Sequence, residues 1–209
     1  LALIGLFVSS SPVIHLRGFE SSLCGVTLER LLRERANIVV PSQFFEEAKL
    51  RYADDIEFGR CELSSSDSVN IESGHRILLF GYGPFDVGLD GDDGLAIDGI
   101  EVVLILPGGG SYQEKSEWID SVVRVYDLLT QKQDLAWNRP ELIHWVSSLQ
   151  SVQKPILYHD KAYWWISDID VADALVRIVL SNQAFPDSVK LSGRRKWSSE
   201  QTFEELSML

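Results

Sequence analysis

The alternation of apolar and polar residues is most regular near the start of the chain. A short apolar run at 13–16 is typical of a buried parallel strand. A loop of mostly small residues follows at 18–25, and 26–35 then predicts an amphipathic helix that begins at the end of this loop. Residues 38–40 form a second apolar run. The stretch therefore predicts a strand–loop–helix–strand unit, whose loop lies at a helix N-terminus, where backbone N–H groups favour phosphate.

Short apolar runs continue to alternate with helical patterns along the rest of the chain. Residues 41–52 predict a helix, and 56–63 and 77–80 predict two further strands. The C-terminal half predicts a helix at 141–149, strands at 154–158 and 189–193, a strand end leading into a helix at 163–180, and a capping box from Ser198 to Gln201. This alternation is typical of an α/β fold, specifically a Rossmann-like doubly wound parallel sheet.

Composition and charge narrow the classes of function. The chain has 209 residues and a net charge of -12, which argues against a nucleic-acid partner because phosphate backbones require clustered Lys and Arg. Cys24 and Cys61 form no disulfide framework or metal motif, so we expect the cytoplasm or another reducing compartment and no metal. No apolar run reaches the roughly 20 residues of a membrane span. The apolar residues 1–8 are interpreted as a strand or packed arm, or as a signal-sequence remnant.

Four segments keep the order and spacing of a known family. They are the strand and loop at 13–25, the strand end at 38–43, the Glu62–Leu63 pair before a Ser-Asp-Ser turn, and the strand end at 77–81. This half resembles an extended short-chain dehydrogenase/reductase, the family of the NAD-dependent epimerases and dehydratases of nucleotide sugars. In the second half, 168–180 resembles the late helix of the family, in which Asp-Val-Ala follows a strand.

The resemblance implies an NAD(P) cofactor and indicates which residues would contact it. When the family loop Gly-x-x-Gly-x-x-Gly is aligned on Gly25, its middle glycine falls on Ser22 and its first on Phe19, with Gly18 one residue earlier. Ser42 and Gln43 stand where an acidic residue would bind the ribose of NAD, which slightly favours NADP. The implied cofactor-binding residues are Gly18, Ser22, Leu23, Gly25, Ser42, Glu62, Leu63, Phe80 and Gly81.

The catalytic residues implied by the resemblance depart from the family pattern. The family needs a Tyr, a Lys four residues later on one helix face, and a Ser on the preceding strand end. No Tyr-x-x-x-Lys occurs in this sequence. The nearest candidates are Tyr112 as proton donor and Lys115 as its support, three residues apart, with Ser111 as a hydrogen-bonding helper.

Two alignments of the middle of the chain remain open. In the first, 100–106 is the fifth strand, 117–130 is a helix on the catalytic face, and 134–140 is the sixth strand. In the second, 102–107 is the sixth strand, and one strand and two helices are missing, catalytic residues included. The first is preferred because it keeps the strand–helix alternation. In both, 85–98 replaces the fourth crossover helix.

Two hypotheses for the function follow. We prefer a non-catalytic or weakly active relative of the NAD(P)-dependent epimerases, dehydratases and reductases. It would act as a binding or structural subunit with a protein partner or as a homo-oligomer, without a cofactor if the site is degenerate. The alternative is an active NAD(P)-dependent reductase or epimerase of a sugar nucleotide or a similar carbonyl substrate. We expect a Rossmann-like nucleotide-binding domain at 1–140 and a small C-terminal substrate-type region at 141–209.

Overall fold

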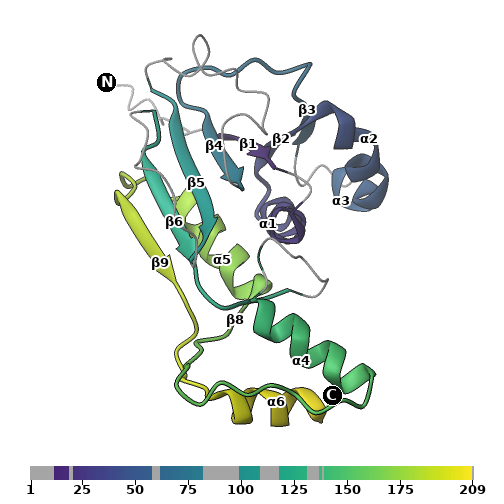
Figure 1. Ribbon diagram of the computed structural model, residues 1–209. Coiled ribbons are helices and arrows are strands. Elements are labelled where there is room, and N and C mark those ends of the chain that lie inside the picture. Colours follow the sequence, from purple (N-terminus) through teal and green to yellow (C-terminus); the bar gives the residue numbers. More distant parts are fainter. Residues whose placement is uncertain are drawn as a thin grey trace, which may run out of the picture.

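The computed structural model describes residues 12–18, 21–57, 62–81, 99–108, 118–130, 137 and 139–208. Within these ranges seven strands form one sheet in the order β3-β2-β1-β4-β5-β6-β9, and each neighbouring pair is parallel (Figure 1). The strands are β1 (Val13–Arg17), β2 (Asn37–Val40), β3 (Glu62–Ser65), β4 (Arg76–Phe80), β5 (Glu101–Pro107), β6 (Ser121–Val125) and β9 (Ser188–Leu191). The predicted Rossmann-like parallel α/β fold is confirmed.

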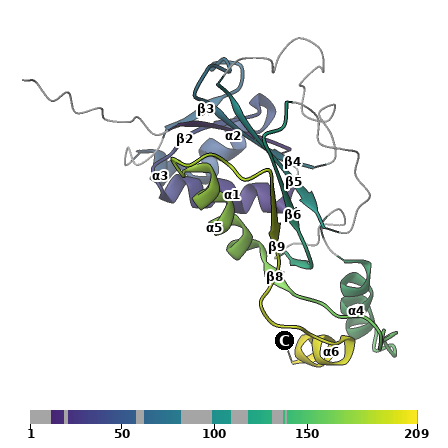
Figure 2. The same cartoon turned by 90° about the vertical axis from the view of Figure 1, so that its left-hand side faces the viewer.

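Of the helices in the described ranges, α1 (Ser22–Arg33) and α5 (Asp168–Val179) cover one face of this sheet. The others are α2 (Ser42–Arg51), α3 (Ala53–Glu57), α4 (Pro140–Gln150) and α6 (Ser199–Ser207). Figure 2 shows α1 and α5 side by side on the same side of the strands. Leu28 and Leu31 of α1 and Leu175 of α5 are fully buried in one apolar core with Ile14 and Leu16 of β1. Successive side chains of a strand point to opposite faces, so this core fixes which face of β1 each residue occupies.

The other face of the sheet carries a second, smaller apolar cluster. Ile77 and Leu79 of β4 and Val102 of β5 are buried there. His15 and Arg17 alternate with the core residues of β1 and therefore lie on this face as well. None of the helices in the described ranges packs against this face (Figure 2).

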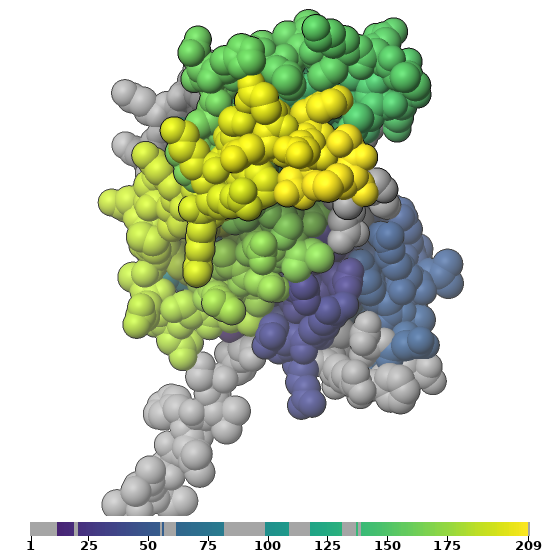
Figure 3. Space-filling view, turned by 90° about the horizontal axis from the view of Figure 1, so that it is seen from below, coloured from purple at the N-terminus to yellow at the C-terminus, as the bar shows by residue number. Residues whose placement is uncertain are grey.

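A small lobe extends from the carboxyl end of β6. It contains α4, α6 and the short parallel pair β7 (Leu128–Leu129) and β8 (Ile166–Ser167). Figure 3 shows the yellow C-terminal residues lying against the green residues of the α4 segment. The predicted capping box is confirmed, because the Ser198 side chain accepts from the Gln201 N–H and the Gln201 side chain accepts from the Ser198 N–H. The chain after 140 does not form this lobe alone, since α5 packs on α1 and β9 pairs with β6.

Two predicted strands and one predicted helix are wrong. Ile56 lies in α3, and the third strand begins only at Glu62. Residues 154–158 have no regular structure. The sixth strand of the first alignment, 134–140, lies mostly outside the described residues, and Pro140 at its end starts α4. The predicted helix at 117–130 is instead β6 followed by β7, because its Val-rich run alternates buried and half-buried positions. The fifth strand of the first alignment is confirmed as β5, whereas the second alignment, which made this run the sixth strand, is wrong.

Some predicted features fall on residues outside the described ranges. They include the apolar residues 1–8 and most of the expected crossover at 85–98. Within the described part of the chain, no helix combines the length and apolar character that crossing a membrane requires.

Candidate functional site

The turn after β1 is pressed against the end of β4. Gly18 has a φ of +78°, and a Cβ built on it would lie 1.9 Å from the carbonyl oxygen of Phe80. Only glycine fits here, because both the backbone conformation and the space exclude a side chain. β1 lies between β2 and β4. The chain adds β2 and β3 on one side of β1 and then crosses to add β4 on the other side, so the strand order reverses direction at β1. In open α/β sheets, ligands bind at the carboxyl edge beside such a switch point.

The first turn of α1 follows directly from the Gly18 turn. The Ser21 N–H donates to the Gly18 carbonyl at 3.2 Å, which closes the turn, and Ser21 is the N-cap of α1. Its hydroxyl makes no capping hydrogen bond and is buried without a hydrogen-bond partner. Cys24 is fully buried against the sheet, whereas a Cβ on Gly25 would meet nothing within 4 Å. Gly18, Ser21 and Cys24 thus have the three-residue spacing of the family loop, one residue before the alignment on Gly25.

Hydroxyl groups gather where β2 and β3 end. The Ser42 hydroxyl lies 2.9 Å from the Ser66 hydroxyl and accepts from the Ser65 hydroxyl at 3.0 Å. The Ser42 N–H, at the start of α2, donates to the Ser66 hydroxyl at 3.1 Å. The cluster lies at the same edge of the sheet as the Gly18 turn, because parallel strands end together. It joins a helix N-terminus to three hydroxyls and contains no carboxylate.

The structure separates the predicted cofactor-binding residues into two groups. Gly18, Phe80 and Gly81 meet at the switch point, and the Gly81 N–H donates to the Ile105 carbonyl at 3.2 Å. Ser22, Leu23 and Gly25 occupy the first turn of α1, and Ser42 is at the start of α2. Glu62 pairs with Asn37 at the amino end of β3, so it lies at the opposite edge of the sheet, and Leu63 follows it with its side chain packed on the core. The Glu62 prediction is therefore corrected, because three residues of strand separate it from the carboxyl edge.

Arg17 is the last residue of β1 and directly precedes the Gly18 turn. Arg17 is 8% exposed. Its one hydrogen bond within the described ranges runs from Nη1 to the carbonyl oxygen of Leu16, at 3.4 Å. Burial lowers the pKa of Arg17.

The ends of β5 and β6 also approach each other closely. A Cβ on Gly108 would lie 2.3 Å from the ring of Tyr126, and the Gly108 N–H donates to the Val125 carbonyl at 2.7 Å. The Tyr126 N–H donates to the Leu191 carbonyl of β9 at 2.8 Å. The half-buried ring of Tyr126 therefore lies over the end of β5, on the carboxyl edge.

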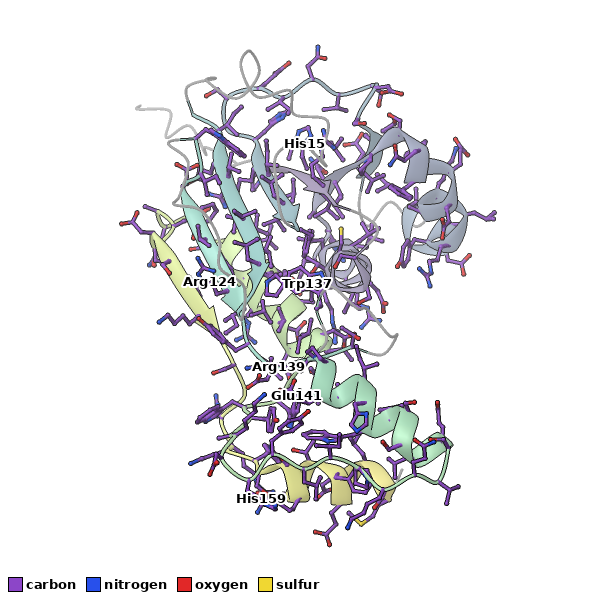
Figure 4. The ribbon with its side chains drawn as sticks, viewed as in Figure 1. His15, Arg124, Trp137, Arg139, Glu141 and His159 are labelled. Atoms are coloured by element: carbon purple, nitrogen blue, oxygen red, sulfur yellow. The ribbon has the colours of Figure 1, made fainter. Side chains whose placement is uncertain are left out.

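Asp127 ties this edge to the small lobe. Its carboxylate is nearly fully buried, and it accepts from Arg139 Nε at 2.6 Å and from the Trp164 N–H at 2.8 Å. The Asp127 carbonyl accepts from the Ile166 N–H at 3.1 Å. Figure 4 shows Arg139 and Glu141 at the junction between the sheet and the lobe. One residue thus joins the end of β6 to the first turn of α4 and to the start of β8.

Aromatic rings and an ion pair fill the lobe. The Tyr163 ring stacks on Trp165 with centroids 5.0 Å apart and meets the edge of Trp145 at 5.4 Å. Lys161 Nζ donates to Glu141 at 2.5 Å. Burial raises the pKa of Glu141, but the Lys161 hydrogen bond and other favourable contacts outweigh it, so the pKa stays below its usual value. The lobe is a packed unit, not an extension of the sheet.

The predicted catalytic residues Ser111, Tyr112 and Lys115 lie outside the described ranges. Their roles stay predictions. β5 ends at Pro107 and β6 starts at Ser121, so the connection that contains them is thirteen residues long, 108–120. The described part of the chain contains no group of three residues arranged to hold a metal ion.

Sequence reasoning missed Arg17, Ser21, Tyr126 and Asp127. Ser21 had a signal, because it stands three residues after Gly18, the spacing of the first two glycines in a dinucleotide-binding loop. Arg17 had a weaker signal, because it is a charged residue at the end of a mostly apolar strand. Tyr126 and Asp127 had none, because the run that contains them was interpreted as a helix.

No family model matches the sequence, and no curated protein sequence matches it. Solved structures share its fold. The terminal R domain of the myxalamid PKS-NRPS biosynthetic pathway has a TM-score of 0.59 at 11% identity, covering 96% of this chain and 70% of that chain. Gre2 from Candida albicans, in complex with NADPH, has a TM-score of 0.56 at 9% identity, covering 92% and 81%. The dTDP-glucose 4,6-dehydratase of Bacillus anthracis, in complex with NAD, has a TM-score of 0.53 at 12% identity, covering 95% and 81%.

Proposed function

We propose that this chain, which has the fold of the extended short-chain dehydrogenases/reductases, binds an NAD(P) dinucleotide at the carboxyl edge of its sheet. In this proposal it acts as a binding or structural subunit with weak or no hydride transfer. The observation that carries the proposal is the Gly18 turn, pressed on the Phe80 carbonyl at the switch point and leading into α1.

The residues of the turn fit a pyrophosphate group. A helix N-terminus presents N–H groups and a positive dipole end to an anion, and Gly18 keeps the approach free of a side chain. The Ser21 hydroxyl is a buried donor without a partner, and an unsatisfied group of this kind needs an explanation in a folded protein. A phosphate oxygen would accept from it. When bound, the dinucleotide supplies a nicotinamide that exchanges hydride with a substrate carbon.

The hydroxyl cluster supports NADP over NAD. An acidic residue at the end of β2 binds the ribose of NAD and repels a 2′-phosphate. The chain has Pro41 and then Ser42 there, and the Ser42, Ser65 and Ser66 hydroxyls offer donors without negative charge. We therefore expect NADP to bind more tightly than NAD.

The length of the β5–β6 connection supports weak or absent catalysis. A crossover between parallel strands takes about a dozen residues or more, its helix included. The connection has thirteen residues, 108–120, which is close to this minimum, so it has room for only a short helix to present Tyr112 and Lys115 on one face. The preference for a binding subunit, with a protein partner or as a homo-oligomer, follows from this shortage.

The alternative is an active NAD(P)-dependent reductase or epimerase of a sugar nucleotide or a similar carbonyl substrate. It is favoured by the small lobe, which is packed and held to the carboxyl edge through Asp127. In this alternative Tyr112 donates the proton, Lys115 supports it, and Ser111 holds the substrate oxygen.

Calorimetric titration of the purified chain with NADPH, NADP, NADH and NAD tests the proposal. We expect NADP(H) to bind and NAD(H) to bind more weakly, with no turnover of 4-keto sugar nucleotides. Absence of binding for all four dinucleotides would contradict the proposal. Turnover that is lost in Tyr112→Phe and kept in Tyr52→Phe, a tyrosine at the C-terminal end of α2, would establish the alternative instead.

A further inference from the structure

Arg17 has a buried charge without an anion beside it. The residue is 8% exposed, and its contact with the Leu16 carbonyl is long at 3.4 Å. No carboxylate in the described ranges pairs with it, and burial is the cause that lowers its pKa. The positive charge of Arg17 also acts on His15. Burial is the largest cause that lowers the pKa of His15, and the charge of Arg17 is the next. A guanidinium cannot lose its proton at ordinary pH, so the charge stays in place.

Three other arginines of the described ranges are paired with carboxylates. Arg76 donates to Glu101 at 2.7 Å, Arg139 to Asp127 at 2.6 Å, and Arg30 lies 3.1 Å from Asp173. Burying a charge without a partner is costly, and replacing buried charged groups by apolar side chains is often neutral or stabilising. A chain that retains such a residue gains something other than stability from it.

The position of Arg17 indicates which anion it serves. It precedes Gly18 directly, and the Ser21 hydroxyl at the other end of the same closed turn also lacks a partner. Two unpaired donors thus flank the turn that approaches the end of β4. The pyrophosphate is the anionic group of a dinucleotide that lies at the first helix of such a fold.

We propose that Arg17 is an anion-binding residue that holds a phosphate of the dinucleotide from the face of β1 turned away from α1. This inference rests on the proposed function, and it adds a charged contact to a turn that otherwise offers only backbone and hydroxyl donors. A phosphate oxygen accepts hydrogen bonds from a guanidinium in a bidentate geometry that a single carbonyl cannot reproduce.

The test compares Arg17→Met, Arg17→Lys and the matched control Arg33→Met, which removes an exposed arginine of α1. Thermal unfolding is measured for each free protein, and affinity is measured for NADPH, ADP, inorganic pyrophosphate, malonate and adenosine. We expect Arg17→Met to have a melting temperature equal to or above that of the original chain. We expect its affinity for NADPH, ADP and pyrophosphate to fall about 10- to 100-fold, with adenosine unchanged. Arg17→Lys recovers part of this loss because it keeps the charge, and Arg33→Met changes nothing.

Each other outcome has a defined meaning. Equal affinity of Arg17→Met and the original chain for NADPH overturns the inference while leaving the proposed function intact. A lower melting temperature for Arg17→Met, with no loss of affinity, assigns Arg17 a structural role and also overturns it. Loss of malonate binding without loss of pyrophosphate binding assigns the anion to a substrate carboxylate. If no dinucleotide binds but pyrophosphate stabilises the original chain and not Arg17→Met, the proposed function fails and the anion site stands. If no dinucleotide binds and pyrophosphate stabilises neither protein, both fail.

Discussion

Two largely buried arginines at opposite edges of the seven-stranded sheet differ in their partners. At the amino edge, Arg76 donates to the Glu101 carboxylate and to the carbonyls of Val179 and Ser181 at the end of α5. At the carboxyl edge, Arg17 is more deeply buried and has only the long contact to a backbone carbonyl. The same residue type is therefore fully satisfied at one end of the strands and left unsatisfied at the other.

Neutral polar groups follow the same division. At the amino edge, the Ser121 hydroxyl donates to the Pro186 carbonyl at 2.7 Å. In the middle of β1, His15 Nε2 is hydrogen-bonded to His75 at 3.0 Å, but His15 Nδ1 is buried without a partner. At the carboxyl edge, the Ser21 hydroxyl has no partner. Arg17 and Ser21, which lie at the two ends of the Gly18 turn, are thus buried donors without a strong partner, as the proposed anion site requires. Departures from local rules in folded proteins concentrate at functional sites for this reason.

The largest effect we expect comes from filling the Gly18 turn. Gly18→Ala places a methyl group against the Phe80 carbonyl in a backbone conformation with φ of +78°. We expect it to lower the free energy of unfolding by about 3–5 kcal/mol, because both the space and the backbone resist it. Urea unfolding followed by circular dichroism measures this, and titration of the surviving folded protein should show weakened NADPH binding.

Gly25→Ala is the matched control for this substitution. Its Cβ would meet nothing within 4 Å, and it lies inside α1. Alanine has the higher helix propensity, so we expect a gain of about 0.5–1 kcal/mol in the free energy of unfolding. If Gly25→Ala were as destabilising as Gly18→Ala, the glycine loop would instead follow the alignment on Gly25.

The parts that the sequence could predict are those where one pattern dominates locally. The unit from β1 to β2 and the helix α5 were predicted because their apolar residues repeat at strand or helix spacing. The capping box at Ser198 was predicted because its two side chains satisfy each other within one turn.

The remaining parts depend on contacts between distant segments. The Val-rich run at 121–125 becomes a strand because it pairs with β5 and β9, which no local window contains. Glu62 was placed at the cofactor edge by its sequence neighbours, but pairing with Asn37 puts it at the other edge. The isolation of Arg17 could not be predicted either, because the absence of a partner is a property of the packed structure.

The second prediction breaks the amino edge. Arg76→Met removes the donor shared by Glu101 and two carbonyls at the end of α5, and it leaves those acceptors unpaired. We expect it to lower the free energy of unfolding by about 2–3 kcal/mol, since Glu101 is partly exposed and recovers some hydration. Dinucleotide affinity should not change. The same chemical substitution thus has different consequences at the two edges. Arg76→Met lowers stability and leaves dinucleotide affinity unchanged, whereas Arg17→Met lowers dinucleotide affinity and does not lower stability. Equal losses of stability for Arg76→Met and Arg17→Met would remove the distinction.

The smallest effect is a pH dependence that arises at His15, in the middle of β1. The Glu72 N–H donates to His75 Nδ1, so that atom accepts, and the neutral His15 must donate to it from Nε2. Its Nδ1 is then buried without a partner, and a second proton would have no acceptor there. Burial, then Arg17, then His75 lower the pKa of His15 from 6.5 to about 3.

The sign follows from comparing protons bound in the two states. Between pH 6.5 and about 3 the unfolded chain protonates His15 and the folded chain does not, so stability falls as the pH falls through this window. The slope reaches at most about 1.4 kcal/mol per pH unit. Urea unfolding between pH 6.5 and 5 measures this slope. The Glu141 carboxylate has a lowered pKa and therefore titrates below this range. His15→Leu should flatten the slope, and His159→Gln, which alters an exposed histidine, should not. A slope that survives in His15→Leu would place the titrating group elsewhere.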